Sequence, residues 1–476
     1  MPQTQETRPP ATPPDAPTSL PQVEETDLLE QDRAQNALAP HQVRWNFRVL
    51  VLDVSFFAIG MAFLDPNAVL PLLMDRLGAS GLLIGAFAAL RFLAFSLVQV
   101  FVAYATHDLP RQKPPLAWAA TITRLPLLVL PFFLWHAADS PIAQRTALWA
   151  TIVLISLWAL GDGLGYVPWM EIVARGFSAR TRGRFFATTQ SISGLCSILI
   201  AGLLVRGILE HPALPYPKNY AVLTGLSALM FQISLIGVLL IREPPPPRRL
   251  RVASGASTSI PPRPPLSTYF QRIPGLIRTN PEFLRLSAIQ LLLGFGAAAA
   301  PFYVLYAKQR FHLNDNWGGI YQVMLAVSVV VLSPLWTWLS ERRSPATAVR
   351  CLALVCLLTP IAALTTGSLS PWAFCLTFLL MGGSLGWGMW IVVNIYLLAH
   401  ISEDERPMFL ALINLLFAPS ALYPVLGGLF VMDNRFVSVW GLPVLFLVTM
   451  VVVATGFVMT LRLPAPGAPA REGRSG

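Results

Sequence analysis

About twelve apolar stretches, most of them close to 20 residues long, run through nearly the whole chain and restrict what it can fold into. A helix that crosses the hydrocarbon core of a bilayer needs about 20 mainly apolar residues. The composition agrees, since 54% of the residues are hydrophobic and only 12% are charged, against about 25% charged in a typical soluble domain. We therefore predict an all-α integral membrane protein with transmembrane helices near residues 47–74, 81–105, 115–137, 146–173, 184–205, 220–241, 283–307, 317–339, 348–364, 372–399, 408–432 and 436–461.

Three other segments are polar, rich in proline and without helical periodicity, at residues 1–46, 242–281 and 463–476. Such composition is typical of disordered tails and linkers. The expected organisation is a Pro-rich tail, a first six-helix half at 47–241, a linker rich in proline and arginine, a second six-helix half at 282–462, and a short C-terminal tail.

Basic residues are concentrated in the linker and in the loops on one side of the predicted helices. Cytoplasmic loops carry an excess of Lys and Arg, so we expect a multi-pass protein of the cytoplasmic (inner) membrane with both termini in the cytoplasm. The formal net charge of +10 is spread over short loops and forms no compact basic domain, which argues against a nucleic-acid partner. The four cysteines have no metal-ligand spacing, and we expect neither a metal nor a cofactor.

Two loop segments repeat each other across the chain. “SARTRGRFFATTQ” precedes the fifth helix and “SEDERPMFLALIN” precedes the eleventh, which pairs Ser178 with Ser402 and Arg182 with Arg406. Small residues four apart, which allow close helix packing, stand before both loops at Gly161, Gly165, Gly382 and Gly386. The repeat predicts two pseudo-symmetric halves, an arrangement common among secondary transporters.

With this pattern the chain resembles the major facilitator superfamily of transporters, over about residues 47–461. The family's loop between the second and third helices usually reads Gly-x-x-x-Asp-Arg-x-Gly-Arg-Arg. “WLSERRSP” keeps part of it in the second half, whereas the first half has “YATHDLPRQKP”; “ARTRGR” is similar to the family's other cytoplasmic loop. The resemblance implies a cytoplasmic gate at Asp108, Arg111, Arg182, Arg184, Glu341, Arg342 and Arg406.

Two further stretches bear on the kind of transporter. The family's antiporter signature in the fifth helix, a Gly-Pro followed by a Gly pair, is absent from “SISGLCSILIAGLL”, which disfavours proton antiport. “DRLGASGLLIG” and “APFYVLYA” resemble a bacterial group of the superfamily with no assigned substrate.

Four charged residues fall inside the predicted membrane helices of the first half: Asp65, Arg91, Arg124 and Asp162. A charge at the centre of a membrane helix costs about 2.5–3.5 kcal/mol on insertion scales and by default indicates a functional site. Alternatively, the two acids and two bases pair only to satisfy each other. The repeat favours binding or coupling, because the corresponding positions of the second half hold uncharged residues, Ala300, Ala326, Leu358 and Gly386.

In the superfamily, helices one, four, seven and ten line the central cavity. The resemblance therefore assigns substrate or coupling roles to Asp65, Asn67, Asp162, Gln290 and Asn394, and we add Arg91 because it lies near the middle of its helix. Asp65 stands beside Pro66, which the repeat aligns with Pro301. We expect the helix break at this proline in both halves.

The remaining polar residues in the helices receive structural roles. We expect Arg124, on helix three, to be a structural partner of the buried acids. Glu171 and Arg175 lie four residues apart on one helix and are expected to pair with each other. Asp53 is expected near the membrane interface.

The sequence favours a secondary transporter that moves a small molecule by alternating access, as a monomer, with proton coupling through Asp65 or Asp162. The alternative is a membrane-embedded binding or assembly factor that has a transporter fold without transport. An enzyme is disfavoured, because the chain has no nucleophile–base pair, no metal motif and no Walker-type phosphate loop.

Overall fold

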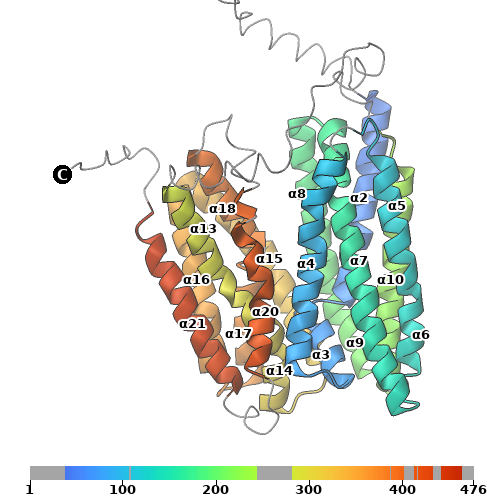
Figure 1. The fold of residues 1–476 in the computed structure, drawn as a ribbon, viewed down its shortest axis with the longest axis vertical. Coiled ribbons are helices and arrows are strands. Elements are labelled where there is room, and N and C mark those ends of the chain that lie inside the picture. The colour runs from blue at the N-terminus through green and yellow to red at the C-terminus, as the bar shows by residue number, and fades with distance from the viewer. Residues whose placement is uncertain are drawn as a thin grey trace, which may run out of the picture.

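The computed structural model describes residues 38–106, 109–243, 281–385, 387–400, 412–414, 416–431 and 441–463. Two of the predicted gate residues, Asp108 and Arg406, lie outside these residues, as do most of the predicted tails and linker. Every regular element in the described residues is helical, which confirms the all-α prediction. The helices form two groups that stand side by side, one for each half of the chain (Figure 1).

The first half supplies the first six membrane spans, several of which consist of more than one helix. Its helices are α2 (Pro40–Phe63), α3 (Val69–Arg76), α4 (Gly81–Thr106), α5 (Lys113–Arg124), η1 (Leu125–Val129), α6 (Leu130–Trp135), α7 (Pro141–Gly176), α8 (Ala179–Leu199), η2 (Ile200–Val205), α9 (Arg206–Glu210) and α10 (Lys218–Leu240).

The second half repeats this arrangement. Its helices are α13 (Pro281–Gly294), η3 (Phe295–Ala298), α14 (Ala300–Phe311), α15 (Trp317–Arg342), α16 (Pro345–Thr366), α17 (Pro371–Gly382), α18 (Trp387–His400), η4 (Ala418–Leu422), α20 (Tyr423–Leu429) and α21 (Gly441–Thr460). In the described residues, 11 helical segments are long and apolar enough to cross a membrane. The predicted span at 372–399 is divided into α17 and α18, each too short alone.

Local chemistry explains where several helices begin. α7, α16 and α17 each start with a Ser-Pro pair, and the serine side chain accepts a hydrogen bond from the backbone N–H three residues later. Serine is a favoured N-cap and proline suits the first helical turn. α2 begins at Pro40, before the predicted start at 47, because Asn46 and Trp45 bond to the backbone of Arg242 and Leu240 at the end of α10.

The first span of each half is broken at the aligned prolines. Between α2 and α3 the chain leaves the helix at Leu64, and Pro66 lies in the turn that follows. Between α13 and α14 a short 3-10 helix precedes Pro301. Proline lacks an N–H and crowds the preceding turn, so the predicted break occurs in both halves.

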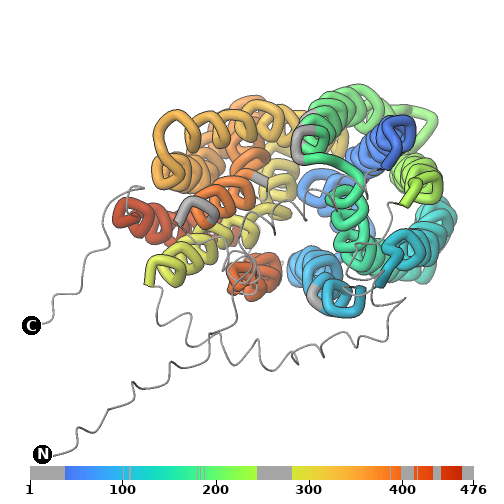
Figure 2. Tube along the Cα trace, turned by 90° about the horizontal axis from the view of Figure 1, so that it is seen from above, coloured from blue at the N-terminus to red at the C-terminus, as the bar shows by residue number. Residues whose placement is uncertain are grey.

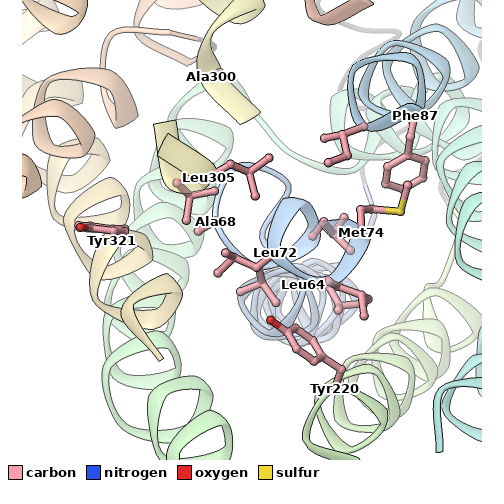
Figure 3. Close-up of a cluster of buried hydrophobic side chains, with 14 of the residues drawn as sticks. Leu64, Ala68, Leu72, Met74, Phe87, Tyr220, Ala300, Leu305 and Tyr321 are labelled. Atoms are coloured by element: carbon pink, nitrogen blue, oxygen red, sulfur yellow. The ribbon is translucent and has the colours of Figure 1, made fainter. Parts of the chain in front are cut away.

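The halves share a hydrophobic core at only one end. We call the end where α2 begins and α21 ends the terminal end, and the opposite one, with α3, α9 and α14, the distal end (Figure 1). The shared core contains side chains from both halves, as Figure 3 shows for Leu64, Leu72, Met74, Phe87, Tyr220, Ala300, Leu305 and Tyr321. Towards the terminal end each half has a separate core, around Phe185 in the first and Trp336 in the second.

Glycines bring backbones of the two halves together at the distal end. A Cβ on Gly85 of α4 would lie 2.1 Å from the carbonyl oxygen of Pro424, and one on Gly428 would lie 2.7 Å from that of Gly81. On the other side of the molecule, a Cβ on Gly319 would lie 2.8 Å from the Ala201 carbonyl oxygen. The view along the helices shows α4 beside α20 and α8 beside α15 (Figure 2). Only glycine permits these contacts.

Candidate functional site

The side chain of Asp65 caps the free backbone N–H groups at the helix break. Its Oδ1 accepts hydrogen bonds from the backbone N–H groups of Asn67 (2.8 Å) and Ala68 (2.9 Å). These are free donors at the start of a helix, and a carboxylate there is favourable. Asp65 is therefore a structural element of the break as well as a candidate for coupling.

Arg91 is the charged neighbour of Asp65, since the two interact electrostatically. Arg91 of α4 lines a small cavity together with Pro66, Met74 and Pro301. The cavity has a volume of about 10 Å³, close to the least space that holds one water molecule. It has no room for a substrate in this conformation, and it lies where both broken spans meet.

Arg124 and Asp162 belong to a second, separate group. The Nη1 of Arg124 donates to the hydroxyl of Ser234 (2.9 Å), and its Nη2 lies 3.8 Å from Oδ1 of Asp162. The Ser234 hydroxyl in turn donates to Oδ1 of Asp53 (2.6 Å), whose Oδ2 accepts from Nε1 of Trp169 (3.0 Å). We call these five residues, from α2, α5, α7 and α10, the polar cluster of the first half.

The position of Asp53 corrects the sequence prediction. Asp53 is 4% exposed and lies inside the first half, whereas we expected it near the membrane interface. A Cβ on Gly237 of α10 would lie 3.0 Å from the Asp53 side chain, so α10 approaches α2 closely at this point and covers the carboxylate. We expected Asp53 near the membrane interface because it lies close to the predicted helix start at residue 47.

Helix contacts hold the polar cluster in place. A Cβ on Gly161 would lie 1.8 Å from the Thr123 hydroxyl, and one on Gly163 would lie 2.3 Å from the Phe95 carbonyl oxygen. α7 is therefore pressed against both α5 and α4 on either side of Asp162. The Phe57 ring lies beneath Arg124, with 5.6 Å between the guanidinium carbon and the ring centroid.

The other predicted substrate residues are not brought together. Gln290 is buried in α13, and its Oε1 has no hydrogen-bond partner among the described residues. Asn394 donates to the Trp390 carbonyl oxygen of its own helix (2.6 Å). Glu171 and Arg175 form the predicted ion pair, with 2.8 Å between Oε1 and Nε.

Five of the seven predicted gate residues lie in the described part of the chain. Arg111, Arg184, Glu341 and Arg342 are exposed, and Arg182 is partly buried with no hydrogen-bond partner for its Nε in the described residues. No ion pair joins any two of these five residues in the described part of the chain.

Charges instead connect the two halves at the distal end. Asp315, 5% exposed, accepts from Nε of Arg76 (2.8 Å), lies 3.2 Å from Nζ of Lys308, and accepts from the hydroxyl of Tyr220 (3.1 Å). Lys308 also donates to Oδ2 of Asp75 (2.8 Å). We call these five residues the distal charge cluster. Asp75, Arg76 and Tyr220 come from the first half, and Lys308 and Asp315 from the second.

The distal charge cluster was missed by sequence reasoning, although a signal was present. Asp75 and Arg76 end the second helix of the first broken span, and Lys308 and Asp315 lie in the last turn of the corresponding helix of the second half and just after it. The hydrogen bond to Asp315 raises the pKa of Arg76 above its already high usual value. Asn316 adds a hydrogen bond to Glu210, and Gln322 donates to the Ala62 carbonyl oxygen, again between the halves.

A wide apolar groove lies away from all these charges. It has a volume of about 890 Å³, runs between α6 and α7, and is lined by side chains that include Phe133, Ile142, Trp149 and Val153. Its lining contains none of the predicted site residues, and its exposed apolar side chains suit contact with lipid.

The described helices form a multi-pass membrane protein of two repeated units. The sequence model of the Major Facilitator Superfamily matches residues 52–423, and the chain belongs to this superfamily. No curated protein sequence matches the chain.

Solved transporter structures share the fold. A bacterial homologue of the human lysosomal transporter Spinster has 15% identity and a TM-score of 0.61, with 91% of this chain and 100% of that chain covered. A bacterial homologue of the iron transporter ferroportin has 14% identity and a TM-score of 0.61, with 90% and 99% covered. The nucleoside transporter NupG has 12% identity and a TM-score of 0.62, with 87% and 99% covered. At these identities the similarity concerns the fold alone.

Proposed function

We propose that this protein is a secondary transporter that moves a small molecule across the cytoplasmic membrane by alternating access. The observation that carries the proposal is the unequal contact between the halves. They share a core and the distal charge cluster at one end, and have separate cores at the other. Such a difference between the ends is expected of two units that rock about a central site.

The orientation follows from the positive-inside rule. The terminal end carries the arginines of the predicted cytoplasmic loops, among them Arg111, Arg184, Arg342 and Arg343. With this end in the cytoplasm, we interpret the structure as an inward-facing state that is closed at the distal end. The Spinster and ferroportin homologues with the same fold were also solved in inward-facing states.

The broken spans give the proposed site its chemistry. Asp65, Asn67 and Arg91 surround the break of the first half, and Asp162 lies in the polar cluster beside Arg124. We assign the substrate and coupling roles to these residues with Gln290 and Asn394. Closure of the cytoplasmic side would bring Arg182, Arg184 and Arg111 of the first half towards Glu341 and Arg342 of the second, with Asp108 and Arg406 completing the gate.

Substrate flux tests the proposal. Purified protein is first screened by thermal shift against a metabolite and drug library, because a ligand of the folded state raises its apparent stability by mass action. Each ligand found is then offered to proteoliposomes, with protein-free liposomes as the control. We expect at least one ligand to accumulate inside. Ligands that stabilise the protein but are never moved would favour the binding or assembly factor instead.

A further inference from the structure

The polar cluster of the first half contains more acids than bases. Asp53 and Asp162 face a single cation, Arg124, and the other two members, Ser234 and Trp169, are neutral. With both carboxylates ionised the cluster would carry one excess negative charge. An uncompensated charge in a membrane interior is costly. Protonation of one carboxylate removes the excess charge and costs less than keeping both carboxylates ionised.

In the described part of the chain, Arg124 is the one cation that acts on Asp53 and Asp162. The titratable neighbour of Asp162 on its own helix is the phenol of Tyr166, one turn away. α4 packs on α7, but its single charged residue, Arg91, interacts with Asp65. α8 packs on α2, but its arginines lie only in its first two turns. The one charged residue of α10, Lys218, lies at the start of that helix, at the distal end. A proton taken up from water would remove the excess charge that the described residues leave.

We propose that the polar cluster binds one proton, and that Asp162 is the carboxylate that holds it. The proposal rests on the proposed transport function and gives its coupling ion a site. Asp53 receives two hydrogen bonds, from the Ser234 hydroxyl at 2.6 Å and the Trp169 N–H at 3.0 Å, which stabilise its ionised form. Asp162 lies 3.8 Å from Arg124, and its side chain is 26% exposed.

The Ser234 hydroxyl sets this division of roles. It donates a hydrogen bond to Asp53 and accepts one from Arg124, so it connects the guanidinium to Asp53. Asp162 is then the more distant partner of Arg124. The proton comes from water, adds to a carboxylate oxygen of Asp162 and returns to water when the site empties. Asp53, Arg124 and Ser234 are positioning residues for this exchange.

Infrared spectroscopy of the reconstituted full-length protein tests the site without a substrate. A protonated carboxylic acid has a C=O stretching band that disappears when the group ionises, and the band is followed from pH 5 to pH 10 in a sodium-free buffer. We expect one titrating band that is absent in Asp162→Asn and retained in the matched variant Asp65→Asn. A band that keeps its full intensity in Asp162→Asn would overturn the assignment.

Asp53→Asn provides a second test, which remains valid even where Asp162→Asn does not fold. It leaves Asp162 alone with Arg124, so the titration midpoint should fall by about one pH unit, a roughly tenfold weaker proton affinity. An unchanged midpoint would contradict the shared-cation argument. Addition of sodium at fixed pH should leave the band unchanged, and its loss would identify a sodium site instead.

The spectroscopic and flux results can fail separately. A titrating Asp162 in a protein that moves no ligand would retain the proton site and reject the transport function. Flux in a protein without this band would retain transport and reject the site.

Discussion

Asp315→Asn should weaken the contact between the two halves at the distal end. The substitution keeps the size of the side chain and one acceptor oxygen but removes the charge that Arg76 and Lys308 share. Lys308 retains Asp75 as a partner (2.8 Å), whereas Arg76 has no other acidic partner in the described ion pairs. The distal-closed state is therefore weakened, and the equilibrium shifts towards a state in which the distal ends are apart.

The structure gives the size of the shift. The Arg76 side chain is 43% exposed, so solvent screening limits its pair with Asp315 to about 0.5–1 kcal/mol. The Lys308–Asp315 ion pair is more buried, with side chains 19% and 6% exposed, and we take it as about 1.5–3 kcal/mol, the range for contacts of charged groups, of which the remaining partner Asp75 preserves about half. The total is about 2 kcal/mol, or about 30-fold in the equilibrium constant. A distal-open state populated at about 1% would rise to about a quarter.

Electron–electron distance measurements detect this change. Spin labels at Ser80→Cys and Gln309→Cys, both exposed and on opposite halves at the distal end, are placed in a protein without its four native cysteines. We expect Asp315→Asn to add a population at longer distance. The matched control Asp139→Asn removes a distal carboxylate whose partner in the described residues is His136 of its own half, and it should change nothing. A distance distribution identical to that of the parent would refute the reasoning.

Two further pairs of substitutions test the break and the glycine contacts. Asp65→Asn and Asp65→Ala both remove the charge that faces Arg91, but only asparagine keeps the Oδ1 acceptor of the break. Asp65→Ala should therefore be less stable than Asp65→Asn by about 1 kcal/mol, as for the loss of an N-cap, and melt earlier; equal melting temperatures of the two variants would contradict the capping role. Gly427→Ala places a Cβ 1.9 Å from the Ala298 carbonyl oxygen and should destabilise the protein by about 1–3 kcal/mol, while Gly207→Ala, where the Cβ meets nothing within 4 Å, should be neutral in the same thermal-denaturation assay.

The fold was predictable because its main signals are local or repeated. The length of each apolar stretch matches the thickness of the bilayer core, so each stretch predicts a membrane helix without reference to the others. The alignment of Pro66 with Pro301 predicted a break in both halves without knowledge of any tertiary contact, since proline cannot continue the backbone hydrogen bonding wherever it stands. The Glu171–Arg175 pair was equally local, because four residues place both on one helix face.

The polar contacts between helices were not predictable in the same way. The burial of Asp53 depends on the approach of Gly237 and the donors Ser234 and Trp169, which lie on two other helices. Asp315 meets Arg76 across 239 residues of sequence, and one sequence gives the sign of each charge but not its partner. The intramembrane charges therefore looked like two acids with two bases. The structure instead places Asp65 and Arg91 at the break of the first span, and Arg124 and Asp162 in a cluster with an added acid, Asp53.

The backbone contact at Gly85 offers a way to trap the opposite conformation. No side chain fits between α4 and α20 while the Pro424 carbonyl oxygen lies against Gly85, so a large residue such as tryptophan there acts as a wedge against the distal-closed state. The rest of α4 would keep its packing against α7, because the substitution faces the other half. Protein held in this way would be a suitable antigen for selecting conformation-specific antibody fragments and a sample for determining the outward-facing structure.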